Sequence, residues 1–300
     1  LWRGLVDVGG TSYGDENIQG AVLDMDESWS SYLPTALRVP IEVYRNRRFL
    51  QHWWTVAQTK VNAGRTGVVV LGRSGAGKSL LTAQMHGVGN QLDWVDPGVS
   101  RNVETHPIPL GPWTEIVRVI PGGHSRERSL GMSEAFQNSP GLEGIIYVCC
   151  AGFTEIRNSV AAGTAVRTGI DTTEKFRRSQ MLEEEADLKQ VCDRILELQA
   201  HGVKPKYLLL AVNKLDLFYN QLDDIQDHYD ISGTGSVARI LQEFARNADT
   251  QSLQIRCVPV SSTMKSFKWN NEVTGSHFDD IELQKNSVRR LLEQLGDLSQ

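Results

Sequence analysis

One glycine-rich loop constrains the fold of this chain more than any other feature. Residues 72–79 read G-R-S-G-A-G-K-S and directly follow the apolar run at residues 67–71. In such a loop, glycines let successive backbone N–H groups curl around phosphate oxygens, the lysine adds a mobile positive charge, and the serine hydroxyl can bind magnesium. The pattern predicts a strand, a phosphate-binding loop and a helix whose N-terminus favours anions. The residues expected to hold a triphosphate are Gly72, Arg73, Ser74, Gly75, Ala76, Gly77, Lys78, Ser79 and Leu80.

From residue 63 to residue 300, short apolar runs alternate with longer amphipathic stretches, which is typical of an α/β domain with a mostly parallel sheet. The expected strands are 67–72, 103–110, 114–120, 144–150, 207–213 and 254–260. The expected helices are 78–87, 174–201, 235–247 and 280–296. Two of these helices should lie on the sheet, because each carries its apolar residues on one face. These residues are Leu188, Val191, Ile195 and Leu198 in the helix at 174–201, and Ile281, Val288, Leu291, Leu292 and Leu295 in the helix at 280–296.

Residues 1–62 lie outside this pattern and are expected to form an N-terminal extension of short strands followed by an aromatic helix. Pro40 is a good first residue for a helix at 41–61. Within that helix, Trp53 and Trp54 either dock it on the main domain or offer a face to a lipid or protein partner.

Composition narrows the classes of partner. With a net charge of -5 and a pI near 5.8, the chain lacks the basic character that nucleic-acid binding usually needs. No stretch approaches the roughly 18 to 20 uncharged apolar residues of a membrane-spanning helix, and no signal-peptide pattern is visible. We therefore expect a cytoplasmic protein, although a start at Leu1 rather than Met leaves a removed leader or an upstream domain open. The four cysteines lack zinc-site spacing and are expected to be buried and reduced: Cys149, Cys150, Cys192 and Cys257.

The run A-V-N-K-L-D-L at 211–217 follows an apolar strand-like run and contains N-K-x-D, formed by Asn213, Lys214 and Asp216. In its order after the phosphate loop, the motif resembles that of the Ras-like and translation-factor-like P-loop GTPases, in which it reads guanine. The chemistry agrees, because an aspartate in this place can accept hydrogen bonds from N1–H and the 2-amino group of guanine. Adenine offers neither donor, so it would leave the carboxylate unpaired at a cost of roughly 1 to 3 kcal/mol.

The resemblance implies a three-layer Ras-like fold that binds GTP or GDP with Mg²⁺. It also implies that Asn213 braces the loop and that Lys214 lies over the base. A last base-contacting segment should follow the sixth strand, where V-P-V-S-S-T puts Ser261 and Ser262 at the matching positions. A plain turn is the alternative for that segment.

One motif of the family is incomplete in this chain. The family carries D-x-x-G at the end of the third strand, where the aspartate holds a magnesium-bound water and the glycine N–H meets the γ-phosphate. Here the sequence reads R-V-I-P-G-G-H, so either Gly122 or Gly123 can serve as the glycine, but Val119 or Ile120 then stands at the aspartate position. We expect the Val119 side chain to face the bound ion at the strand end; packing under the sheet is the alternative. In the second register, His124 matches a water-orienting histidine of translation factors; a solvated loop histidine is the alternative.

Two serines are the expected magnesium ligands. Ser79 ends the phosphate loop, and Ser100 is favoured over Thr105 as the ligand that the first switch of the family supplies. A strand beginning at residue 103 would start too early for Thr105 to lie in a loop. The stretch 151–173 lengthens the connection after the fourth strand; it is expected to be a mobile surface loop, or a segment that reaches phosphates or a partner.

The sequence thus predicts a slow Mg²⁺-dependent GTPase that acts as a switch or assembly regulator. Lys78 and the loop amides would stabilise charge on the transferred phosphate. One alternative is a nucleotide-binding scaffold that barely hydrolyses, used as an interaction module. Another is an ATPase or small-molecule kinase in which N-K-x-D is accidental. A protein partner or a second copy would bind through the N-terminal extension or the 151–173 stretch.

Overall fold

The computed structural model describes residues 67–87, 104–110, 113–120, 141–156, 158–248 and 253–299. Several predictions fall outside these residues, namely the N-terminal extension with its aromatic helix and the candidate site residues Ser100, Gly122, Gly123 and His124.

A six-stranded sheet forms the centre, in the order β2-β3-β1-β4-β5-β6. The strands are β1 (Val68–Leu71), β2 (Glu104–Leu110), β3 (Trp113–Val119), β4 (Gly144–Cys149), β5 (Tyr207–Val212) and β6 (Gln254–Pro259). β2 runs antiparallel to β3, and all other neighbours are parallel. The predicted mostly parallel sheet is confirmed, and only β3 begins outside its expected range, by one residue.

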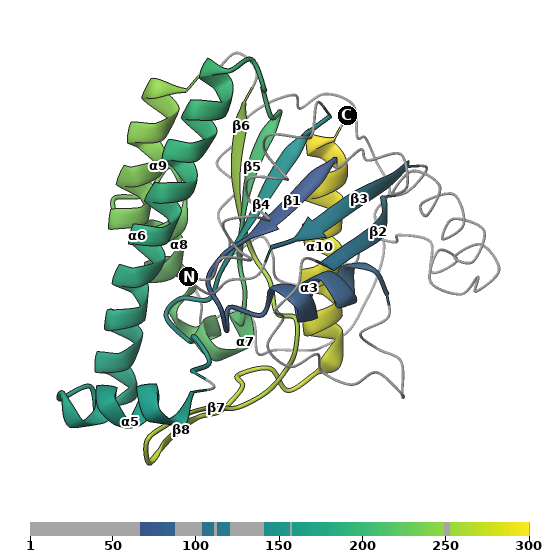
Figure 1. The fold of residues 1–300 in the computed structure, drawn as a ribbon. Helices are drawn as coiled ribbons and strands as arrows, with labels where there is room; N and C mark the ends of the chain where they lie inside the picture. The colour runs from purple at the N-terminus through teal and green to yellow at the C-terminus, as the bar shows by residue number, and fades with distance from the viewer. Residues whose placement is uncertain are drawn as a thin grey trace, which may run out of the picture.

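Helices cover both faces of the sheet, so the predicted three-layer α/β fold is confirmed (Figure 1). One face carries α3 (Lys78–Met85) and α10 (Ile281–Leu298), and the other carries α6 (Thr173–Ala200), α8 (Leu222–Tyr229) and α9 (Ser236–Asn247).

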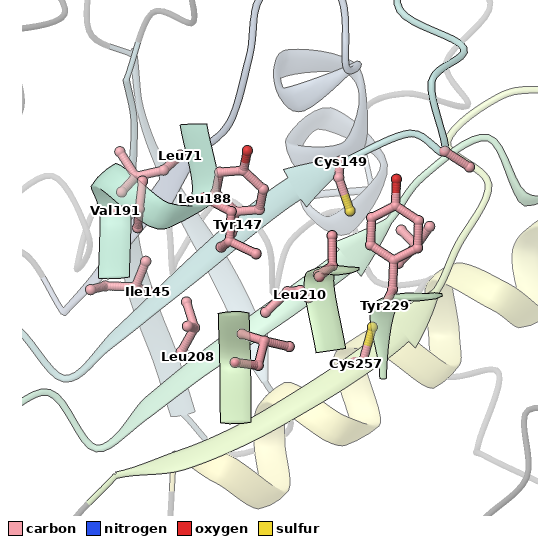
Figure 2. Packing of buried hydrophobic residues seen from close by; sticks show 14 of the residues in the cluster. Leu71, Ile145, Tyr147, Cys149, Leu188, Val191, Leu208, Leu210, Tyr229 and Cys257 are labelled. Carbon is pink, nitrogen blue, oxygen red and sulfur yellow. The ribbon is translucent and has the colours of Figure 1, made fainter. Parts of the chain in front are cut away.

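The two cores follow from strand periodicity, because successive side chains point to opposite faces. In β4, Ile145 and Tyr147 join the core under α6, while Ile146 and Val148 join the core under α3 and α10. Figure 2 shows Tyr147 and Tyr229 among the aliphatic side chains of the first core. The four cysteines are buried and free, as predicted.

Some short elements were not predicted. They are α5 (Ser159–Arg167), α7 (Leu215–Phe218), the 3₁₀ turn η3 (Tyr219–Gln221), α8, and a hairpin of β7 (Phe267–Trp269) and β8 (Glu272–Thr274). The expectation of a surface loop throughout 151–173 is therefore wrong. Asn158 starts α5 by accepting hydrogen bonds from the N–H groups of Val160 and Ala161, at 3.0 and 3.2 Å.

Aromatic stacking fixes the β7–β8 hairpin against the start of α6. The rings of Phe176 and Trp269 stack with centroids 3.8 Å apart, and the indole N–H of Trp269 donates to the Ile170 carbonyl at 3.0 Å. One sequence assignment on α10 is also wrong: Ile281, placed on its apolar face, is 49% exposed. Within the described residues, no helix is long and apolar enough to cross a membrane.

A polar cluster lies under the end of β4. The Glu184 carboxylate accepts hydrogen bonds from the hydroxyl of Tyr229 at 2.6 Å and the backbone N–H of Cys150 at 3.1 Å. Burial raises the pKa of Glu184, and these hydrogen bonds oppose the shift. One buried carboxyl group therefore joins α6 to α8 and to the residue that follows β4.

Candidate functional site

The phosphate loop connects β1 to α3 and depends on its glycines. Gly77 precedes the helix with a φ of 91°, and Gly72 has a φ of 132°. A Cβ on Gly72 would lie 2.1 Å from the Val148 carbonyl oxygen, so the loop can pass the end of β4 only without a side chain there. The predicted strand, loop and helix are present in that order.

Lys78 begins α3 and folds back over the loop. Its ammonium group donates to the carbonyls of Gly72 and Arg73, at 2.9 Å each, and the side chain is buried. These bonds hold a positive charge beside the loop amides. The arrangement suits a group that must meet an anion at the start of a helix.

Arg73 contributes to the loop differently from its neighbours. Its guanidinium donates to the side-chain oxygen of Gln180 at 3.1 Å and pairs with Glu183 at 3.4 Å, both on α6. The side chain therefore anchors the loop to α6, and only its backbone remains a candidate for contact with phosphate.

Asn213 joins the base motif to the phosphate loop. Its side-chain amide donates to the Ala76 carbonyl at 2.9 Å, and its side-chain oxygen accepts from the Ser262 N–H at 3.0 Å. It has no exposed surface. The structure thus brings three separately predicted segments together at one residue.

Asp216 lies in the first turn of α7, buried except for 1% of its surface. One carboxylate oxygen, Oδ1, accepts a hydrogen bond from the Ser261 hydroxyl at 2.6 Å, whereas Oδ2 has no hydrogen-bond partner among the described residues. Burial raises the pKa of Asp216, and the nearby hydroxyls of Ser261 and Ser276 oppose that shift. A buried acceptor without a donor is costly unless a ligand supplies one.

Lys214 makes contacts that the sequence did not reveal. It adopts a φ of 65°, which is rare for a residue other than glycine and turns the chain into α7. Its ammonium donates to the Phe153 carbonyl at 2.6 Å, lies 3.4 Å from the Glu155 carboxylate, and sits 5.8 Å from the centroid of the Phe267 ring. Since the Glu155 N–H donates to the Gly75 carbonyl at 3.3 Å, the segment after β4 also contacts the phosphate loop.

The other end of the loop meets β2. The Ser79 hydroxyl donates to the Glu104 carboxylate at 3.3 Å, and Glu104 is the first residue of β2. No motif singled out Glu104. One feature of the sequence could have pointed to it: the G-P pair at 111–112 is a turn dipeptide between two strand-like runs. A hairpin that turns at this pair places Glu104 opposite Val119.

Val119 and Ile120, the two candidates for the missing aspartate position, are both 1% exposed. Val119 packs in the apolar core with Leu81 and Met85 of α3. The expectation that its side chain faces a bound ion at the strand end is therefore wrong. Thr105 lies within β2, as predicted, although its side chain is outside the described ones.

The donor set fits a guanine nucleotide with magnesium. Oδ2 of Asp216 is a buried acceptor without a partner among the described residues and suits the donors of a base. The loop amides and Lys78 suit phosphates, and the Ser79 hydroxyl, beside Glu104, is a hard oxygen of the kind that Mg²⁺ prefers. The described residues contain no group of three or more His, Cys, Asp or Glu that could hold a metal alone. Phosphate oxygens and water would have to complete the coordination, as is usual for this ion.

No protein-family model matches the chain, and no curated protein matches it. Among solved structures, Toc33 from Arabidopsis thaliana in complex with Mg²⁺ and GMPPNP is similar at 12% identity and a TM-score of 0.44, over 90% of this chain and 96% of that one. The mammalian SRP receptor is similar at 15% identity and a TM-score of 0.39, over 77% and 99% of the two chains.

A GTP-binding protein from Sulfolobus solfataricus in complex with GDP is similar at 14% identity and a TM-score of 0.37, over 85% of this chain and 60% of that one.

Proposed function

We propose that this chain binds guanine nucleotides, GTP and GDP, and hydrolyses GTP slowly with Mg²⁺ as a switch or assembly regulator. One observation carries the proposal: Asp216 is buried with Oδ1 bonded to Ser261 and Oδ2 without a partner among the described residues. Guanine supplies the missing donors through N1–H and its 2-amino group, whereas adenine supplies none there. Asp216 lies three residues after Asn213, whose side-chain amide donates a hydrogen bond to the Ala76 carbonyl of the phosphate loop. The candidate base site and the phosphate loop are therefore neighbours.

The phosphate half of the proposal rests on the loop and on Lys78. Lys78 already lies against the carbonyls of Gly72 and Arg73, so it needs little reorganisation to meet phosphate oxygens. Magnesium, when bound, neutralises charge on the phosphates of the nucleotide. Neither Val119 nor Ile120 offers a carboxylate to a magnesium-bound water, which favours slow hydrolysis. We further propose that the N–H of Gly122 or Gly123 contacts the γ-phosphate and that His124 orients the attacking water. Ser100 is the proposed second serine ligand of magnesium.

A hydrolysis-deficient scaffold is the second candidate function, and the apolar surroundings of Val119 favour it. Such a protein would bind GTP as tightly but would not turn it over. The partner would be a protein or a second copy. We place its contact on the N-terminal extension or on the 151–173 segment, where α5 buries no residue and leaves Val160 72% exposed.

Calorimetric titration of nucleotide-stripped protein with GDP, a non-hydrolysable GTP analogue and the matching adenine nucleotides tests the proposal. We expect binding of both guanine nucleotides and a loss of roughly 1 to 3 kcal/mol or more for adenine. Equal affinity for both bases would overturn it. Single-turnover hydrolysis of GTP then separates the slow GTPase from the scaffold, and the nucleotide released from purified protein on denaturation gives an independent identification.

A further inference from the structure

We propose that Glu104 is a metal-positioning residue that orients Ser79 toward the magnesium of a bound nucleotide. The inference rests on the proposed function, because it assigns a residue of the same site. The carboxylate of the metal site would then lie on β2, the antiparallel edge strand of the sheet. The D-x-x-G motif of the family would instead put it at the end of β3.

Sheet topology brings Glu104 to the loop. Glu104 pairs with Val119 across the β2–β3 hairpin, and Val119 pairs with Val70 of β1. β1 then runs into the phosphate loop and α3, where Ser79 lies in the first turn. Two residues that are 25 positions apart in the sequence therefore meet with Oγ and Oε1 3.3 Å apart.

The direction of this hydrogen bond matters for metal binding. A serine hydroxyl has one proton and two lone pairs, and only a lone pair can bind a cation. When Glu104 accepts the proton, the proton points away from the cation and the Ser79 oxygen can offer it a lone pair. Partners of this kind orient a ligand and raise its basicity.

The other carboxylates near the loop are placed differently. Glu155 lies 3.4 Å from Lys214, on the base side, and Glu183 lies 3.4 Å from Arg73, on the α6 side. Val119, directly opposite Glu104, faces the apolar core. Among the described residues, Glu104 is thus the carboxylate whose position fits the role that the sequence leaves vacant.

The test is the free Mg²⁺ concentration needed to slow release of a fluorescent GDP analogue from the full chain. Glu104→Gln should raise this concentration by about 10 to 100-fold, the range for losing such a partner. Affinity for the analogue in excess chelator should stay within a factor of about two, because base and phosphate contacts are intact. Glu143→Gln is the matched control, since Glu143 precedes β4 at the opposite end of the sheet.

Two further variants separate the outcomes. Ser79→Ala combined with Glu104→Gln should be no worse than Ser79→Ala alone, because Glu104 acts through Ser79. Glu104→Asp keeps the charge and should fall between the parent and the glutamine variant, which also covers the case that Glu104→Gln fails to fold. An unchanged magnesium requirement in Glu104→Gln, with the parent binding the analogue normally, would overturn this proposal alone. A parent that binds no guanine nucleotide even in chelator would overturn the proposed function with it.

Discussion

The side-chain amide of Asn213 donates a hydrogen bond to the Ala76 carbonyl at 2.9 Å, across 137 positions of sequence. This bond and the one from the Ser262 N–H make Asn213 the link between the base loop and the phosphate loop. Asn213→Asp keeps the shape but replaces the donor with an acceptor facing a carbonyl.

We expect Asn213→Asp to lower the free energy of unfolding by roughly 1 to 3 kcal/mol, the usual cost of a buried polar group left unpaired. Chemical denaturation without nucleotide measures this, and Asn220→Asp, at an exposed site in η3, is the control. A variant as stable as the parent would show that the Asn213 side-chain hydrogen bonds contribute nothing to the free energy of unfolding.

Asp216→Asn should shift the base preference from guanine to xanthine nucleotides. A carboxamide donates toward the 2-oxo group of xanthine but mispairs with the 2-amino group of guanine. We expect GTP affinity to fall by roughly 1 to 3 kcal/mol. Competition binding measures the change, with the exposed Asp224→Asn as control. Unchanged GTP affinity in Asp216→Asn contradicts the assignment of the base pocket.

Lys78→Ala should weaken triphosphate binding by about 2 kcal/mol or more, since a charged hydrogen-bond donor is lost. Calorimetry with a GTP analogue checks this. Lys175→Ala is the matched control, because Lys175 is exposed and forms an ion pair with nearby Asp171 at 2.7 Å. If Lys78→Ala binds as tightly as the parent, the loop is not the phosphate site.

Val119→Asp should destabilise the protein without strengthening magnesium binding. The new carboxylate would lie in the apolar core and opposite Glu104, so we expect a loss of about 3 kcal/mol. Thermal melts and magnesium titrations run together measure both properties. Val273→Asp is the control, because Val273 in β8 is 61% exposed. A gain in magnesium affinity at parental stability would mean that Val119 faces the ion after all.

Glu184 should make stability depend on pH. Burial raises its folded-state pKa above the ordinary value of 4.5, so the Glu184 carboxyl stays protonated to a higher pH in the folded chain than in the unfolded chain. Stability relative to Glu184→Gln is then highest below that ordinary value and falls as pH rises through the folded pKa, by at most about 1.4 kcal/mol per pH unit. Urea denaturation of both proteins at several pH values measures the difference. Glu243→Gln, at an exposed position, is the control variant. If the stabilities of Glu184→Gln and the parent change with pH in the same way, the prediction is refuted.

The sequence by itself determined the strand, loop and helix around Lys78 and the N-K-x-D segment after β5. Both depend on local requirements: glycine at left-handed positions, an apolar strand before the turn, and side-chain types suited to phosphate and base. The long helices were equally predictable, since their apolar stripes repeat over many turns. The short β7–β8 hairpin was not, because a hairpin of that length is stable only through packing such as that of Phe176 on Trp269.

Only the tertiary structure decided how the metal end of the site is built. Whether Val119 faces the ion or the core depends on strand register, in which a shift of one residue reverses every side chain. The approach of Glu104 to Ser79 depends on the pairing of β2 with β3, which the turn dipeptide between them signals, and on the pairing of β3 with β1, which no local pattern encodes. The sequence could therefore show that a carboxylate was missing from β3, but only the paired strands could show that Glu104 of β2 lies beside Ser79.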